Sequence, residues 1–291
     1  MLSLNDQFTY CLSMPFVTGT LIDNTPFKKV ISKKTKKIDC SKQPTLEVKT
    51  IDLSAVAAAP NLELFSFGPN CIEEVDLNHL NICKNLNDIY IKVGKSVNLS
   101  PLASSSASVL HVTFDYPPKK ALPFFSPKVE QIDLSFLPSS VRSVRLHFKN
   151  ASEINLASLP SSIKKLHIGG KVKNLDLRPL ESLDLAHLSI SDTSQKELLL
   201  PESGLENLEL FALMRSEIET LWLDKLSTSL KLKTLNLAYT TWNQAFFYGL
   251  EELEHLHNVN IYDTKRAYIQ DKYLEGHNKV KSSGIKRYFM E

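Results

Sequence analysis

Two near-copies of one twelve-residue stretch constrain the fold of this chain more than any other feature. LPSSVRSVRLHF occupies residues 137–148 and LPSSIKKLHIGG occupies residues 159–170, so the second copy begins 22 residues after the first. Each copy runs Leu-Pro-Ser-Ser and then places apolar residues at the spacing apolar-x-x-apolar-x-apolar. A regular interval of this size is typical of repeat architectures, in which each coil buries its apolar face against the next.

The short apolar pattern recurs on both sides of these copies. One series contains the triplets Val141/Val144/Leu146, Ile163/Leu166/Ile168, Leu185/Leu188/Ile190, Leu205/Leu208/Leu210, Leu232/Leu235/Leu237 and Leu256/Val259/Ile261. A second series of apolar-x-apolar pairs ends at Ile91, Val112, Leu134, Leu156, Leu177, Leu200 and Leu223. Because successive side chains of a strand face opposite ways, the two series predict coils of about 22 residues that carry two short strands each.

At this level of detail the chain resembles the leucine-rich repeat proteins. LKTLNLAYT (232–240) and HNVNIYDT (257–264) follow the form L-x-x-L-x-L-x-x-N/T. The LPSSIKKLHIGG copies look like the FNIP-type repeats of social amoebae, although the chain lacks the Phe-Asn-x-Pro-Ile signature of those repeats. The resemblance implies a right-handed leucine-rich repeat solenoid, mainly β or α+β in class, that binds other proteins and has no chemistry of its own.

Three segments are expected along the chain. Residues 1–45 form an N-terminal cap or basic segment, residues 46–264 the solenoid and residues 265–291 a helical C-terminal cap. The stretch TTWNQAFFYGLEELEHL (240–256) predicts a helix between the last two strands. The basic segment has six clustered lysines, which indicate either a nuclear-localisation or phosphate-binding patch or a solvated strand edge. These lysines are Lys28, Lys29, Lys33, Lys34, Lys36 and Lys37.

The composition is that of an ordinary globular protein, with 43% hydrophobic and 23% charged residues and a formal net charge of +2. No window approaches the ~18 consecutive apolar residues of a membrane span, and the first residues lack the basic region of a signal peptide. None of the four cysteines forms a CxxC pair. We therefore expect reduced thiols in the cytoplasm or nucleus, with two disulfides in a secreted protein as the alternative.

Binding rather than catalysis is the expected activity, because the sequence contains no phosphate-binding loop, nucleophile elbow or zinc-protease motif. We expect no catalytic residue, cofactor or metal. His147, His167 and His187 stand 20 residues apart, but they occupy different places in their triplets. The prediction is that these three rings do not share one face and do not form a metal site.

Outward positions of the first series predict a partner-binding surface on the concave face, because solenoids bind through that side. The residues predicted to contact a protein partner are Arg142, Arg145, Lys165, His167, Glu209, Asn236 and Asn260. In the second series Leu199 and Trp222 point outward in adjacent coils, so they either form a second patch or lie beneath a cap. The alternative function is nucleic-acid or acidic-lipid binding through the lysine-rich N-terminal segment.

Overall fold

The computed structural model of the 291-residue chain describes residues 16–21, 24–40, 48–72, 74–93, 97–114 and 133–262. The expected C-terminal cap at 265–291 lies outside these ranges. The chain divides into two compact units, one formed by Met1–Pro127 with Phe136–Val141 and the other by Lys128–Ser135 with Arg142–Glu291. Strands dominate both units, and no helix in the described ranges is long and apolar enough to cross a membrane.

The first unit contains a four-stranded sheet and a set of stacked parallel strands. The sheet has the order β2 (Pro26–Val30), β1 (Phe16–Leu21), β4 (Val48–Asp52) and β6 (Glu74–Val75). The parallel strands are β3 (Lys37–Asp39), β5 (Leu64–Ile72), β7 (Asp88–Val93) and β8 (Val109–Phe114). β3 pairs with β5, β5 with β7, and β7 with β8. Short 3-10 helices, η1 (Ser54–Ala58), η2 (Asn78–Ile82) and η3 (Ser100–Ser104), follow β4, β6 and β7.

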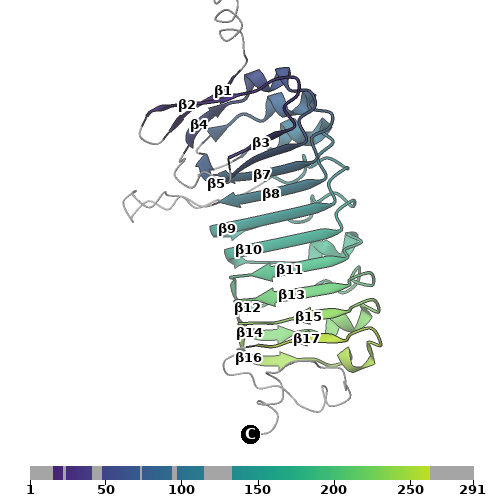
Figure 1. Ribbon diagram of the computed structural model, residues 1–291. Coiled ribbons are helices and arrows are strands. Elements are labelled where there is room, and N and C mark those ends of the chain that lie inside the picture. The colour runs from purple at the N-terminus through teal and green to yellow at the C-terminus, as the bar shows by residue number, and fades with distance from the viewer. Residues whose placement is uncertain are drawn as a thin grey trace, which may run out of the picture. The chain divides into compact units, whose positions relative to one another are not determined.

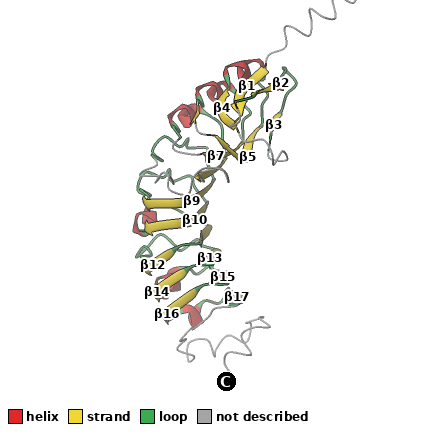
Figure 2. Ribbon diagram, turned by 90° about the vertical axis from the view of Figure 1, so that its left-hand side faces the viewer, coloured by secondary structure: helices red, strands yellow, loops and turns green. Residues whose placement is uncertain are grey.

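The second unit has a main sheet of parallel strands, visible as the lower ladder of Figure 1. These strands are β9 (Ser143–Glu153), β10 (Lys165–Asn174), β11 (His187–Ser191), β13 (Leu210–Met214), β15 (Thr234–Asn236) and β17 (Asn258–Asn260). A smaller parallel sheet consists of β12 (Ser194–Glu197), β14 (Glu217–Trp222) and β16 (Thr241–Phe246), and Figure 2 shows it on the other side of each coil. The 3-10 helices η4 (Arg178–Ser182), η5 (Asp224–Thr228) and η6 (Leu250–Glu252) complete the coils.

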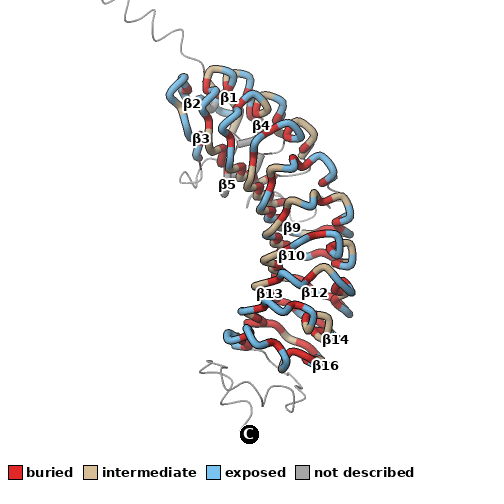
Figure 3. The backbone as a smooth tube through the Cα atoms, turned by 90° about the vertical axis from the view of Figure 1, so that its right-hand side faces the viewer, coloured by how far each residue is buried: buried red, intermediate tan, exposed pale blue. Residues whose placement is uncertain are grey.

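The core of the second unit is a stack of apolar rows between its two sheets. Ile168 pairs in register with Leu146 on one side and Ile190 on the other, and all three are at most 1% exposed. Leu166 lies in the adjacent row between Val144 and Leu188. Buried and exposed positions alternate along these strands (Figure 3). The predicted inward direction of Leu166 and Ile168 is confirmed.

The fourth triplet of the first series was assigned to the wrong residues. Leu188 pairs with Phe211 and Ile190 with Leu213, so the strand of this coil is built on Leu208, Phe211 and Leu213 rather than on Leu205, Leu208 and Leu210. Both sets fit the same template, since Leu208 can be either its second or its first member. Register partners are then separated by 23 residues between β11 and β13, and by 24 between β13 and β15. The corrected spacing is more even than the predicted one.

The second predicted series combined two kinds of strand. Ile91 and Val112 lie on β7 and β8, the strands that pair directly with each other in the stack of the first unit. Leu177 and Leu223, in contrast, immediately precede 3-10 helices, and so do Leu53, Leu77 and Leu99. The true counterparts of Leu177 in the first unit are therefore these three leucines and not Ile91 and Val112.

The helix predicted over residues 240–256 is wrong. Thr241–Phe246 is strand β16, and only Leu250–Glu252 forms a short 3-10 helix. Trp242 and Ala245 are buried because they pair in register with Ile218 and Leu221 of the preceding coil. Stacking on that coil decides the conformation, and it overrides the helix-like spacing of Phe246, Phe247, Leu250 and Leu253.

Repeated parallel strands with leucine-rich inner rows make the second unit a β-rich solenoid, and its repeats resemble leucine-rich repeats. The finer resemblance to FNIP-type repeats stays a prediction.

Candidate partner-binding face

The outward side chains of β9, β10, β11, β13, β15 and β17 form one face of the second unit, which we call the strand face. Strand register arranges these side chains in columns that run across the sheet. The central column consists of Arg145, His167, Ser189, Ala212, Asn236 and Asn260. The column that precedes it along the strands consists of Ser143, Lys165, His187, Leu210, Thr234 and Asn258.

Glu209 does not lie in the central column where the sequence placed it. The corrected register gives that position to Ala212, which is 3% exposed. Glu209 instead precedes β13, where its backbone amide donates to the carbonyl of Ala186 and its carboxylate pairs with Lys233 at 2.9 Å. It therefore lies on the rim of the strand face, in a position equivalent to that of Lys164.

The three histidines share one face, contrary to the sequence prediction. His147 pairs in register with Gly169, and His167 with Ser189, so all three rings project from the same side of the sheet. They form a diagonal across three strands, from His147 on β9 through His167 on β10 to His187 on β11. The prediction failed because it compared places within triplets, whereas a strand has a period of two, so residues 145 and 147 point the same way.

Among the other predicted contact residues, Arg145 and Lys165 are exposed and His167 is half-buried on the strand face. Arg142 lies just before β9, where its guanidinium donates to the carbonyl of Ser162 at 3.3 Å. Asn236 and Asn260 have structural roles, since their side-chain oxygens accept from the backbone amides of Ala238 and Tyr262, each at 3.1 Å. The structure thus brings all seven residues to the strand face or its rim, and Arg142 lies in the same rim row as Lys164 and Glu209.

An apolar row on the same face was missed in the sequence. The three outward positions of β13 are Leu210, Ala212 and Met214. Leu210 and Met214 are half-buried, and the side-chain amide of Asn236 donates to the sulfur of Met214 at 3.4 Å. The row separates the basic and histidine-rich strands β9 to β11 from the asparagines of β15 and β17. The spacing of 23 residues from Ile190 to Leu213 was the signal that would have revealed it.

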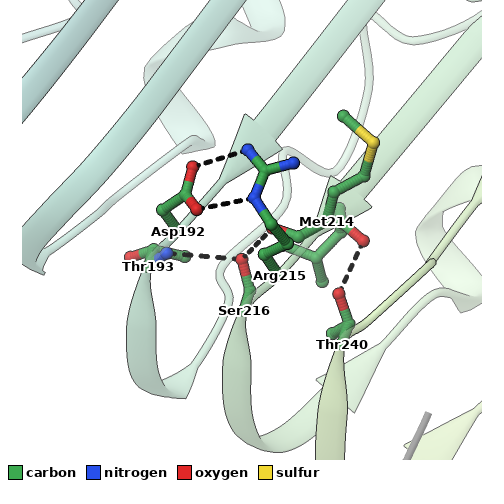
Figure 4. Close-up of polar contacts among 7 residues, drawn as sticks. Asp192, Thr193, Met214, Arg215, Ser216 and Thr240 are labelled. Carbon is green, nitrogen blue, oxygen red and sulfur yellow. Dashed lines mark hydrogen bonds and ion pairs between the residues drawn. The ribbon is translucent and has the colours of Figure 1, made fainter. Parts of the chain in front are cut away.

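Left-handed backbone recurs in four successive coils, within β10 at Gly170 and after β11, β13 and β15 at Asp192, Arg215 and Tyr239. Their φ angles are 91°, 60°, 49° and 60°. At two neighbouring corners the side chains form an ion pair, in which the Nε of Arg215 donates to Asp192 Oδ1 at 2.8 Å and its Nη2 donates to Oδ2 at 2.9 Å (Figure 4). The hydrogen bond from Arg215 is the main cause that lowers the pKa of Asp192.

Beneath these corners lies a short row of buried hydroxyl groups. Thr193, Ser216 and Thr240 are at most 4% exposed. The Oγ of Ser216 donates to the carbonyl of Met214 at 2.9 Å and accepts from the amide of Thr193 at 3.3 Å, and the Oγ1 of Thr240 donates to the carbonyl of Leu213 at 2.7 Å (Figure 4). These contacts satisfy backbone groups that the turn leaves outside the sheet ladder.

The opposite side of the coils carries a column of side-chain caps. Asp or Asn side chains accept the backbone amide two residues further on, at 2.8–3.0 Å, just where a 3-10 helix or turn begins. The residues are Asp52, Asp76 and Asn98 in the first unit and Asp133, Asn155 and Asp176 in the second. In the next three coils this position holds Leu199, Trp222 and Phe246.

Trp222 is 38% exposed and stacks on Phe246, with ring centroids 4.1 Å apart and planes inclined by 9°. Leu199 is half-buried in the adjacent coil. The two residues of the predicted second patch therefore occupy one column, in which Phe246 takes the third place. No side chain at position 199 could form such a side-chain cap, because residue 201 is proline and has no backbone amide to donate.

Hollows in the second unit lie along the smaller sheet. One of about 720 Å³ is lined by residues of β10, β12, β14 and β16. Its charged side chains are mostly acidic, with Asp176, Glu197, Glu217 and Glu219 against Lys173 and Lys196.

Within the described ranges, no three His, Cys, Asp or Glu side chains are grouped to hold a metal ion. Cys40 and Cys83 are buried, Cys83 is a free thiol, and burial raises its pKa to about 11. The lysine-rich segment is tied into the first unit: the Nζ of Lys28 lies 5.9 Å from the ring centroid of Phe16, and Lys36 pairs with Glu63 at 2.7 Å.

No protein-family model matches the chain, and no curated protein matches it in sequence. Its fold is similar to that of internalin C2 from Listeria monocytogenes, at 16% identity and a TM-score of 0.48, covering 80% of this chain and 85% of the internalin. Internalin InlF from the same organism is 15% identical, with a TM-score of 0.44 and coverage of 87% and 82%. The PEPR1–AtPEP1 structure is 14% identical, with a TM-score of 0.45 and coverage of 76% and 36%.

Proposed function

We propose that this protein is a non-catalytic protein-interaction module, a scaffold or substrate-recognition subunit, whose right-handed coils of about 22 residues present the strand face as the concave binding surface. One observation carries the proposal. Polar side chains in register cross six parallel strands, and most of them are half-buried or exposed. Solenoids generally use such an extended face to hold a partner.

The predicted contact residues Arg142, Arg145, Lys165, His167, Asn236 and Asn260 remain the proposed contacts, with Glu209 moved to the rim. The free, buried thiol of Cys83 supports a reducing compartment such as the cytoplasm. The lysine-rich segment is not part of the proposed site, since Lys28 and Lys36 already have partners within the first unit.

A binding comparison of two variants and one control variant, Lys196→Glu, tests the proposal. The full chain is used to capture its partner from the native cell, and the captured protein is then purified and titrated against Arg145→Glu, Trp222→Ala and Lys196→Glu. We expect Arg145→Glu to abolish binding, because the charge reversal faces the partner directly, and the other two variants to bind as the wild type does. Thermal melting confirms that each variant is folded. Loss of binding in Trp222→Ala alone would assign the partner to the opposite side.

A further inference from the structure

The strand face is electrostatically one-sided over β9, β10 and β11. Over the first five residues of each strand, the nine outward positions hold one arginine, one lysine, three histidines, three serines and one glycine, with no carboxylate among them. They are Ser143, Arg145, His147, Lys165, His167, Gly169, His187, Ser189 and Ser191. Such a cluster favours an anionic partner.

Carboxylates on the border of this region are already paired. Asp192 is held by Arg215, Glu209 by Lys233, and Asp184 by Lys164 and Asn207. Arg145 and Lys165, in contrast, form no ion pair with any residue in the described ranges. Two fixed positive charges therefore stay available on the face, and the planar guanidinium of Arg145 suits a carboxylate ligand.

Gly169 lies at the centre of this cluster and is itself buried. A Cβ built on Gly169 would lie 2.6 Å from His147 Nδ1, 3.0 Å from Ser191 Oγ and 3.1 Å from His167 Nε2. Polar atoms from three strands thus pack closely over the glycine and leave no room for a side chain at this position.

Three imidazoles lie among these positions. His187 is faced by Lys165, Lys233 and Glu209, and its pKa is lowered first by burial and then by Lys165. His147 acts on the neighbouring Asp192, and the Nδ1 of His167 lies 3.0 Å from the hydroxyl of Ser189. The fixed positive charge of the cluster therefore comes from Arg145 and Lys165.

The neighbouring apolar row favours a peptide over a nucleic acid. Proteins that bind single-stranded nucleic acids combine basic grooves with aromatic side chains for base stacking, and the nine positions contain no Phe, Tyr or Trp. Leu210 and Met214 on β13 offer instead a small, adaptable apolar surface directly beside the cluster. An acidic segment that carries an apolar side chain fits both parts.

We propose that the strand face over β9, β10, β11 and β13 binds an extended acidic segment of a partner protein, with its carboxylates on Arg145 and Lys165 and an apolar side chain on Leu210 and Met214. This inference rests on the proposed function and adds the chemistry of the partner.

The test uses the full chain and three fluorescent probes of similar length: a peptide rich in Glu with one Leu, the same peptide with Gln in place of Glu, and a single-stranded RNA. Anisotropy titrations give the affinities. We expect the Glu peptide to bind at least about tenfold more tightly than the Gln peptide. Arg145→Glu and Lys165→Glu should each weaken it by about tenfold or more, whereas Lys196→Glu on β12 serves as the matched control and should have no effect.

Equal binding of the Glu and Gln peptides, or tighter binding of the RNA, would overturn the inference. The two binding experiments together distinguish failure of this inference from failure of the proposed function. If capture of the native partner depends on Arg145 but acidic peptides do not bind, the strand face is the binding surface and only the partner chemistry is wrong. If neither depends on Arg145, both proposals fall.

Discussion

Arg215 holds Asp192 of the preceding coil by two hydrogen bonds of 2.8 and 2.9 Å, and both residues have a left-handed backbone. Since the hydrogen bond lowers the pKa of Asp192, its contribution to stability is full above the unfolded-state pKa of about 3.9 and is lost as pH falls through the lower folded value. Because both groups are partly exposed, it amounts to at most about 1 kcal/mol.

We therefore expect wild type to be more stable than Arg215→Gln by a constant amount above about pH 5, and this difference to shrink below about pH 4. Urea denaturation of both proteins across this range measures it. A difference that stays the same down to about pH 2 would show that the ion pair does not contribute.

Tyr239 occupies a left-handed corner with φ 60°. Tyr239→Ala and Tyr239→Gly both remove its edge-to-face contact with Tyr262, whose ring centroid lies 5.4 Å away. The two variants then differ mainly in backbone strain, and Gly adopts this conformation without cost. We expect the glycine variant to be the more stable of the two by about 1 kcal/mol. Thermal denaturation checks the order, and the reverse order would mean that strain at this corner is negligible.

Trp222 stands where earlier coils have a side-chain cap. Trp222→Ala and Trp222→Asn both lose the stack on Phe246, but asparagine can accept the backbone amide of residue 224, as Asp176 accepts that of Arg178. We expect Trp222→Asn to exceed Trp222→Ala in stability by about 1 kcal/mol. Chemical denaturation of both variants is the measurement. Equal stabilities would show that this coil cannot form the cap.

Leu166 is 2% exposed at the centre of the stacked apolar rows. Leu166→Ala should lower the free energy of unfolding by about 2–5 kcal/mol, the range for emptying a packed core position. Lys165→Ala, one residue away and exposed, is the control and should change it by no more than about 0.5 kcal/mol. Similar losses in both variants would contradict the inward direction of Leu166.

Most of the repeat pattern could be predicted because leucine and isoleucine recur at strand spacing around a clear landmark. The two Leu-Pro-Ser-Ser copies fixed the register at Val141 and Ile163, where one triplet alone fits the template. In LELFAL (208–213) two triplets fit, since the hydrophobic pattern does not distinguish Leu208 as a first or a second member. Only the pairing of Leu188 with Phe211 decides between them.

The candidate site was harder to predict because it depends on relations between coils. Since alternate residues of a strand face the same side, strand register places His147, His167 and His187 on one face. Their constant separation of 20 residues, shorter than the repeat, did not indicate this arrangement. The side-chain caps of Asp76 and Asn98 escaped notice because Val112 and Leu134 are 22 residues apart and seemed to continue one series. A regular interval alone cannot show that two strands belong to different sheets.

The strand register of the second unit also has a mechanical consequence. β9 and β10 share eight register pairs, whereas β15 and β17 share three. In a stack where each coil adheres only to its neighbours, a pulling force applied at the C-terminal end would detach the β17 coil first and proceed toward β9. Each released coil of 24 residues would lengthen the chain by about 80 Å, so the extension under tension would rise in steps whose force increases along the stack.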